Sequence, residues 1–378
     1  MLDLQKIRSD FPHLARCVYL NTAAAGLSWA GQGNAAAKFY DSTKTLGMGG
    51  AAEWAAHVTA AKRELGALMD VSPQRIHFVG STTEALNLVA LSLPLEHGDA
   101  VVIAEDEFPS VVHAWLGWQA RGVELIQVPI ATEAQRTQTL CKAVRGGVRA
   151  LAVSHIHWRT GTRVDIEQLS ARCREYDCRL IVDGVQAVGA VPVHAGSADA
   201  YCASVFKWLL SGFGLGFVAV SETLADELQP VVRGYNNEPP SRSIRYGHIN
   251  YPGVYALLAS LEYLRSLGWV EIFSRVDALA SRAIATLSSR GFEVITPADA
   301  HGGIVSIQHP EASSLVQALA AESVFVEDRG PVLRVSPHFY NTEEDIDRFV
   351  SALVRHARPS PSSDSTTSLL PTKPNHTA

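Results

Sequence analysis

The chain has 378 residues, 47% of them hydrophobic and 19% charged, which is typical of a folded protein with one large or two medium domains. Its net charge is −6 and no block of basic residues stands out, so nucleic acids and anionic membrane surfaces are disfavoured as partners. No segment approaches the roughly 18 apolar residues of a membrane span, and the N-terminus lacks the apolar run of a signal peptide. We therefore expect a soluble cytoplasmic protein.

The cysteines exclude two further classes of protein. There are five of them, an odd number, and no two form a C-x-x-C pair. This pattern argues against a disulfide framework and against a structural zinc site. We expect no metal.

From residue 75 onward, short β-branched runs alternate with amphipathic helical patterns. The runs that read as strands lie at residues 75–81, 100–107, 124–130, 150–156, 179–184, 200–205 and 216–221. The helical patterns lie at residues 83–92, 108–121, 133–144 and 166–177. Strands that are apolar throughout are typical of a parallel sheet covered on both faces. The sequence therefore predicts an α/β fold with a mainly parallel seven-stranded sheet between helices.

The pattern changes after Tyr251. Two long helical patterns are followed by shorter strands and two further helices, at residues 251–268, 270–291, 292–297, 302–308, 312–322 and 332–357. These elements predict a smaller α+β domain. We place the large domain at residues 18–255 and the small domain at residues 1–17 together with 256–356. Residues 357–378 are rich in Ser, Thr and Pro and are predicted to form a disordered tail.

One lysine and one aspartate suggest chemistry at the sheet. Lys207 stands between Phe206 and Trp208, before a glycine-rich loop, and Asp183 ends the strand at 179–184. Ligands of such sheets bind beyond the carboxyl ends of the strands. Pyridoxal phosphate needs a lysine that forms a Schiff base and a carboxylate beside its pyridine nitrogen. The alternatives are a lysine that only reaches out to water and an aspartate that only caps a turn. The two residues in this order favour the cofactor.

A phosphate could bind near residue 82. Ser81, Thr82 and Thr83 lie between a strand and a helix, where hydroxyls and free N–H groups meet the positive end of the helix dipole. The alternative is an ordinary helix cap, and both roles can coexist. Ser204 could add another hydroxyl.

These segments resemble the class V aminotransferase family of pyridoxal-phosphate enzymes, which includes cysteine desulfurases and isopenicillin N epimerase-like proteins. The motifs follow in the family's order across residues 18–350: VYLNTAAAGL, GSTTEALNLVA, SHIHWRTGTRVDI, LIVDGVQAVGAVPV, SVFKWLLSGFGLGF, YGHINYPGVYAL and LRVSPHFYNTEEDID. The resemblance implies fold type I and a homodimer whose partner contributes to each site. It implies Lys207 as the Schiff-base lysine and Asp183 at the pyridine nitrogen.

The resemblance also implies the other site residues. For the cofactor these are Gln186 near the phenolic oxygen, Phe108 on the ring, and Thr82, Thr83, Ser204 and His248 at the phosphate. For the substrate they are Arg334 and Asn21 at the carboxylate, with Trp158 nearby. An arginine in the apolar strand VLRVS suits a carboxylate, because its fork binds both oxygens. The alternatives are a structural ion pair for Arg334 and a turn role for Asn21.

The chain departs from the family pattern at several positions. Phe108, Trp158 and His248 stand where the family usually has His, Asn and Thr. His113, His155 and His157 are alternatives for proton transfer, although a structural role suits each better. The segment ALAAESVFVEDRGPVLR lacks the mobile cysteine of the members that act through a persulfide.

The expected enzyme therefore acts on an amino acid through an external aldimine and loss of a Cα proton. Our leading hypothesis is a lyase that cleaves the carbon–sulfur bond of a cysteine S-conjugate or similar substrate without an enzyme persulfide. An amino-acid epimerase and an aminotransferase are alternatives, and an inactive binding protein of the same fold is another. A dinucleotide site at GFGLGF is disfavoured, because these glycines lie between Lys207 and a strand instead of between a strand and a helix.

Overall fold

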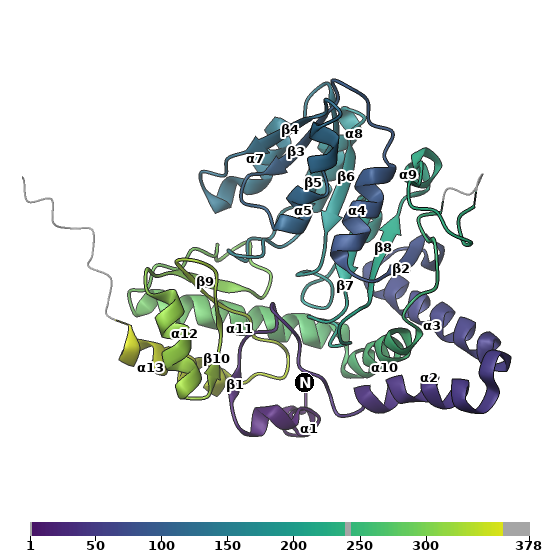
Figure 1. Ribbon diagram of the computed structural model, residues 1–378. Coiled ribbons are helices and arrows are strands. Elements are labelled where there is room, and N and C mark those ends of the chain that lie inside the picture. Colours follow the sequence, from purple (N-terminus) through teal and green to yellow (C-terminus); the bar gives the residue numbers. More distant parts are fainter. Residues whose placement is uncertain (1, 239–242, 358–378) are drawn as a thin grey trace, which may run out of the picture.

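The computed structural model describes residues 2–238 and 243–357 (Figure 1). Apart from Ala357, the tail predicted at 357–378 lies outside the described residues. Among the helices of the described ranges, none combines the length and the apolar character that crossing a bilayer requires.

The large sheet has seven strands in the order β2-β8-β7-β6-β5-β3-β4. Their bounds are β2 Ile76–Val79, β3 Ala100–Ala104, β4 Glu124–Val128, β5 Val148–Ser154, β6 Arg179–Asp183, β7 Ala200–Ser204 and β8 Gly216–Val220. β8 runs antiparallel to both of its neighbours, and the other neighbouring pairs are parallel. The predicted α/β fold with a mainly parallel seven-stranded sheet is confirmed.

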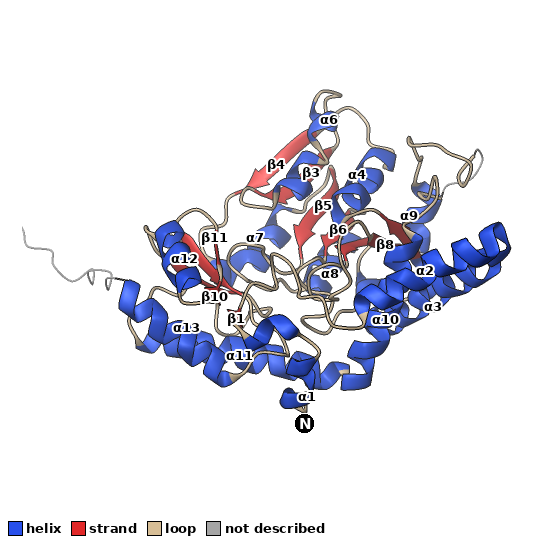
Figure 2. Ribbon diagram, turned by 60° about the horizontal axis from the view of Figure 1, so that its bottom comes forward, coloured by secondary structure: helices blue, strands red, loops and turns tan. Residues whose placement is uncertain are grey.

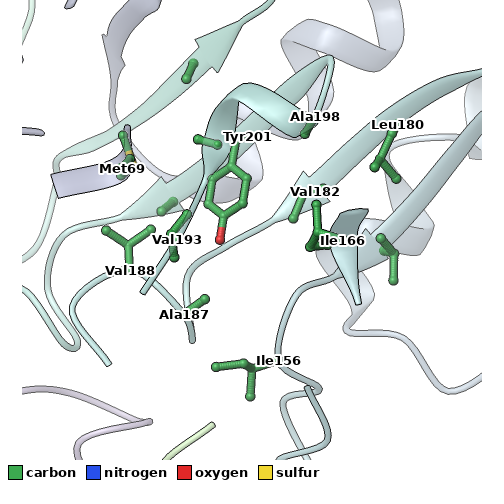
Figure 3. Close-up of a cluster of buried hydrophobic side chains, with 14 of the residues drawn as sticks. Met69, Ile156, Ile166, Leu180, Val182, Ala187, Val188, Val193, Ala198 and Tyr201 are labelled. Carbon is green, nitrogen blue, oxygen red and sulfur yellow. The ribbon is translucent and has the colours of Figure 1, made fainter. Parts of the chain in front are cut away.

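Helices cover both faces of this sheet, because side chains alternate between two apolar layers. Val101, Ile103 and Ile181 enter one layer, while Leu180 and Val182 enter the other. Figure 3 shows part of the second layer, which also holds Tyr201 of β7 and Ile166 of α8. The covering helices are α4 Thr82–Ser92, α5 Pro109–His113, α6 Leu116–Gln119, α7 Arg136–Ala143, α8 Ile166–Glu175 and α9 Glu222–Glu227. The single helix predicted at 108–121 is thus wrong, since the chain breaks into α5 and α6 around the buried Trp115.

Three long helices pack beside the sheet, at the lower right of Figure 1: α2 Gln32–Leu46, α3 Ala51–Met69 and α10 Tyr251–Leu267. Phe39 of α2 stacks on Tyr251 of α10, with ring centroids 5.6 Å apart. Val254 and Leu257 of α10 pack in the same apolar layer as Leu180 and Val182 of the sheet. The domain boundary predicted at residue 255 therefore falls inside a helix that packs on the large sheet.

A smaller unit lies at the lower left of Figure 1. Its elements are β9 Val305–Gln308, β10 Val324–Phe325, β11 Glu327–Asp328, β12 Val332–Val335, α11 Trp269–Ser289, α12 Ala312–Ala321 and α13 Glu343–His356. β11, β12 and β9 form an antiparallel sheet, and β10 pairs with the N-terminal strand β1, Val18–Tyr19. Val18 and Leu20 pack in the core of this unit together with Leu333 and Phe349. Figure 2 shows α11 and α13 below it, and helix α1, Leu4–Ser9, nearby.

Candidate active site

Asp183 and Lys207 lie where three neighbouring strands end. Ser154 at the end of β5 is the register partner of Asp183 on β6, and Asp183 is in turn the partner of Cys202 on β7. Lys207 follows β7 in the turn that leads to β8. The antiparallel β8 starts beside Ser204, so both ends of the turn are held in the sheet.

Burial controls the charges of Lys207 and Asp183. It lowers the pKa of the Lys207 ammonium to about 8, although the Asp183 carboxylate opposes this change. It also raises the pKa of Asp183 to about 6, against a hydrogen bond from the Val185 N–H at 2.9 Å and the charge of Lys207. A cation beside Asp183 would keep this carboxylate ionised, as the protonated nitrogen of a pyridine ring does. The pair therefore fits pyridoxal phosphate.

The start of α4 forms a polar corner with the end of β7. The backbone N–H of Thr82 donates to the Ser204 hydroxyl at 2.8 Å, and the hydroxyls of Thr82 and Ser204 lie 2.9 Å apart. Ser81 caps the helix by accepting from the Glu84 N–H. A Cβ on Gly216 would approach the Ser81 backbone to 2.9 Å, so a glycine lets β8 pass this close. Hydroxyls at a helix N-terminus suit a phosphate. Thr83 instead bonds Ser110, with the hydroxyls 2.8 Å apart.

Gln186 links three segments of the site. Its amide nitrogen donates to the Ala23 carbonyl at 3.0 Å, and its amide oxygen accepts from the Trp208 indole at 2.9 Å. The buried Gln186 thus ties the segment around Asn21 to the Lys207 turn. The Asn21 side-chain oxygen is buried and has no hydrogen-bond partner among the described residues. A buried oxygen without a hydrogen-bond partner destabilises the folded protein unless a ligand supplies that partner.

Arg334 is buried and already partnered. Its Nη2 donates to Glu327 at 2.6 Å, and its Nη1 donates to the Trp158 carbonyl, also at 2.6 Å. Burial lowers the pKa of Arg334 to about 10 although Glu327 opposes the change. The ion pair considered as the alternative role of Arg334 is therefore present. Sequence reasoning missed Glu327, which only the register of β11 and β12 places opposite Arg334.

Trp158, whose carbonyl accepts from Arg334, packs against a second aromatic ring. Phe108 and Trp158 meet edge to face, with ring centroids 5.6 Å apart and an interplanar angle of 70°. The Trp158 indole N–H donates to the Asp106 carbonyl at 3.1 Å. The guanidinium of Arg329 lies over the Trp158 ring, 5.9 Å from its centroid.

A polar cluster that sequence reasoning missed supports the Trp158 loop. The buried Arg136 binds Asp106 through two hydrogen bonds of 3.0 and 2.6 Å, and Glu133 through two of 2.9 and 2.8 Å. His157 bonds the Asp106 carbonyl at 2.9 Å. Asp106, Glu133 and His157 are close enough to hold a metal ion, but Arg136 already pairs with both carboxylates.

The other histidines lie in three different environments. His155 is buried, bonds the Tyr201 hydroxyl at 2.8 Å, and has its pKa lowered by burial to about 3. It is therefore neutral at ordinary pH. His113 is exposed on α5. His248 is exposed beside Tyr235, with ring centroids 5.2 Å apart, and lines a cavity of about 240 Å³ with Glu84 of α4.

Comparisons with known proteins agree with this geometry. The family model described as Aminotransferase class-V matches residues 18–349. An isopenicillin N epimerase of Streptomyces clavuligerus is 29% identical over 78% of this chain and 83% of its own length. A cysteine desulfurase of Salmonella newport is 26% identical over 93% of this chain and 98% of its own. The uncharacterized aminotransferase YcbU of Bacillus subtilis is 28% identical over 76% and 80%.

Solved structures share the fold. A lysine-to-alanine mutant of C-DES, which holds glycine covalently linked to its PLP cofactor, superposes with a TM-score of 0.86 at 20% identity, covering 92% of this chain and 98% of that one. The apo cysteine desulfurase of Thermococcus onnurineus has a TM-score of 0.85 at 21% identity, covering 94% and 98%. The predicted fold type I is thereby confirmed. The chain belongs to the class V aminotransferase family of enzymes, whose cofactor is pyridoxal phosphate.

Proposed function

We propose that the protein is a lyase that cleaves the carbon–sulfur bond of a cysteine-derived amino acid, such as a cysteine S-conjugate, without forming a persulfide on its own cysteines. The state of its thiols carries this proposal. All five cysteines are free, and only Cys141 is not buried. Burial raises the pKa of the Cys17, Cys141 and Cys202 thiols. Protonated thiols are poor nucleophiles, so an enzyme of this kind would release the sulfur as the substrate's own thiol.

The loop before Arg334 supports the same conclusion. Residues 318–334 include the end of α12, β10, β11 and the first part of β12, and none of them is a cysteine. Elimination from a cysteine S-conjugate needs no enzyme thiol, because the carbon–sulfur electrons leave with the sulfur. The remaining fragment takes up water and ends as pyruvate and ammonia.

The proposed roles of the chain's residues follow from their positions. Pyridoxal phosphate, when bound, supplies an electron sink for the charge that develops at the substrate Cα. Asp183 would keep the proton on the pyridine nitrogen through its negative charge. Lys207 would form the Schiff base in the resting enzyme, and once free it would take the Cα proton. Its lowered pKa favours the neutral amine that this step needs.

Other side chains would position the reactants. Thr82 and Ser204 would bind the phosphate at the start of α4, with Thr83 and His248 nearby. Gln186 would face the phenolic oxygen, and Phe108 would cover the ring. Arg334 and Asn21 would bind the substrate carboxylate, and Trp158 would limit the space beside it.

We also propose a homodimer located in the cytoplasm. Large apolar side chains are exposed around the cavity that His248 lines, since Phe213 and Tyr235 are 71% and 60% exposed. Such exposure near a cavity is typical of a protein interface. Free thiols are the usual state of cysteines in the reducing cytoplasm.

The experiment that tests the lyase proposal is a substrate panel. Purified holoenzyme is incubated with S-alkyl and S-aryl cysteines, cystine and ordinary amino acids, and pyruvate, ammonia and thiol are measured. We expect all three products in equal amounts from the cysteine derivatives. Accumulation of the D-isomer would instead establish epimerisation, which similarity to the Streptomyces epimerase favours as the second candidate. A keto acid with the substrate's full carbon skeleton would establish transamination.

A further inference from the structure

The carboxylate subsite contains three charged groups instead of one. Glu327 on β11 lies opposite Arg334 on β12 in the strand register, and Arg329 follows β11 directly. Glu327 bonds both arginines at once: its Oε2 accepts from Arg334 at 2.6 Å, and its Oε1 pairs with Arg329 Nη2 at 2.5 Å. The two guanidinium groups and one carboxylate leave a net charge of one positive unit. One added carboxylate would neutralise the group.

All three charges act at the catalytic lysine. Arg334 and Arg329 both lower the pKa of Lys207, and Glu327 raises it. The cluster therefore lies within electrostatic reach of the amine, where a substrate amino acid would sit. Arg329 also rests over the Trp158 ring, which holds its guanidinium at the rim of the site.

Both terminal nitrogens of Arg334 are partly occupied while Glu327 is bound. Each of its terminal nitrogens already gives one N–H, to Glu327 and to the Trp158 carbonyl. Only Nε has no partner within the described part of the chain. A substrate carboxylate that approaches the fork also meets the like charge of Glu327, which is unfavourable in a buried site.

We propose that Glu327 competes with the substrate carboxylate for Arg334, and that Arg329 receives Glu327 when the substrate binds. In this exchange each of the charged groups has a partner of opposite charge before and after the substrate binds. Before binding, Glu327 bridges the two arginines; afterwards, Arg334 pairs with the substrate and Arg329 with Glu327. Because Arg329 has a 31% exposed side chain, it can move more easily than the buried Arg334. Glu327 and Arg329 are thus positioning residues that set the affinity for amino-acid carboxylates.

The proposal rests on the assignment of Arg334 to the substrate carboxylate and is tested by binding, without turnover. Propionate has the carboxylate but no amino group, so it cannot react with the cofactor. Its dissociation constant is measured by calorimetry on the holoenzyme. We expect Glu327→Gln to bind propionate about tenfold more tightly, which corresponds to about 1.4 kcal/mol of binding free energy. Arg329→Gln should bind it more weakly, because Glu327 then has no other partner.

The double variant separates two roles of Arg329. If it acts only by receiving Glu327, the loss caused by Arg329→Gln disappears in the Glu327→Gln background. A loss that persists unchanged there would overturn the exchange. Asp347→Asn, which removes a carboxylate from the exposed Arg282 pair, is the matched control and should leave propionate binding unchanged.

The remaining outcomes are also decisive. Unchanged or weaker binding in a folded Glu327→Gln protein would refute the competition. If that variant does not fold, Arg329→Gln still tests the idea, because unchanged propionate affinity there would refute it. Failure of the underlying assignment looks different: Arg334→Gln would then bind propionate as tightly as the unaltered protein does.

Discussion

Replacing Arg136 by Met should destabilise the protein strongly and in a pH-dependent way. The side chain of Arg136 is 1% exposed, and those of its partners Asp106 and Glu133 are 19% exposed each. Removing one member of a buried ion pair costs about 3–5 kcal/mol. Because both carboxylates keep some contact with water, we expect the lower end, about 3 kcal/mol at neutral pH. The midpoint of urea unfolding measures the loss.

The sign of the pH dependence follows from the two carboxyl groups. Burial alone raises the pKa of Asp106 and Glu133, but the hydrogen bonds and charge of Arg136 outweigh it and hold both pKa values below their usual range. In the unaltered protein this stability is present above the unfolded pKa values of about 4 and is lost as the pH falls through the lower folded ones. Without Arg136, burial raises the pKa values of both carboxyl groups. As the pH falls, their protonation removes the unpaired buried charges that destabilise the variant. The difference in the free energy of unfolding between the two proteins should therefore be largest near neutral pH. It should decrease toward the acidic pH at which carboxyl groups titrate.

Two results would refute this reasoning. One is a loss of unfolding free energy below about 1 kcal/mol, which is the contribution of an exposed ion pair. The other is a loss that is the same at neutral and at acidic pH. Arg282→Met removes an arginine from an exposed pair and is the control, which should change the midpoint little. We also expect the Arg136 variant to bind substrates more weakly, because Asp106 holds the Trp158 indole.

Three further predictions concern the chemistry. Lys207→Ala should lose both turnover and the visible absorbance of the bound cofactor, and in the unaltered apo-protein the rate of cofactor capture should rise with pH through about 8; capture that does not depend on pH would contradict the neutral-amine role. Asp183→Asn should slow exchange of the substrate Cα hydrogen with deuterated solvent, measured by NMR, and undiminished exchange would remove Asp183 from the mechanism. Serine at all five cysteine positions should leave turnover per folded enzyme unchanged, whereas selective loss at one position together with a protein-bound persulfide, detected by mass spectrometry, would contradict the lyase proposal.

The sheet and the positions of Lys207 and Asp183 after its strands were predictable because their signals are local. Each strand is a continuous apolar run, and the rule that ligands bind at the carboxyl ends of strands then selects Asp183 and Ser204. The contact between Ser204 and Thr82 agrees with that reasoning, although the two residues are 122 positions apart. The break between α5 and α6 was missed because Trp115 has a helical pattern in sequence and is buried only by tertiary packing.

The partners of Arg334 and Trp158 could not be predicted in the same way. β11 has only two residues, too few for a recognisable strand pattern, so its register with β12 was hidden. The Asp106–Trp158 contact joins loops 52 residues apart. An arginine in an apolar strand indicates that some carboxylate is near, but it does not say whether the protein or the substrate supplies it.

The strand order also determines when each pair of strands can form during synthesis on the ribosome. Edge strand β2 pairs with β8, so Ile76 cannot pair until Ala219 has been synthesised. Strand β1 likewise cannot pair with β10 until Val324, the partner of Val18, has been synthesised. Chains emerge from the N-terminus at about 5–20 residues per second, so these early strands stay unpaired for many seconds. The corner where Thr82 meets Ser204 cannot form until Ser204 has been synthesised. A nascent chain that stops short of Ser204 therefore lacks the polar corner at the start of α4, and one that stops short of β12 lacks Arg334.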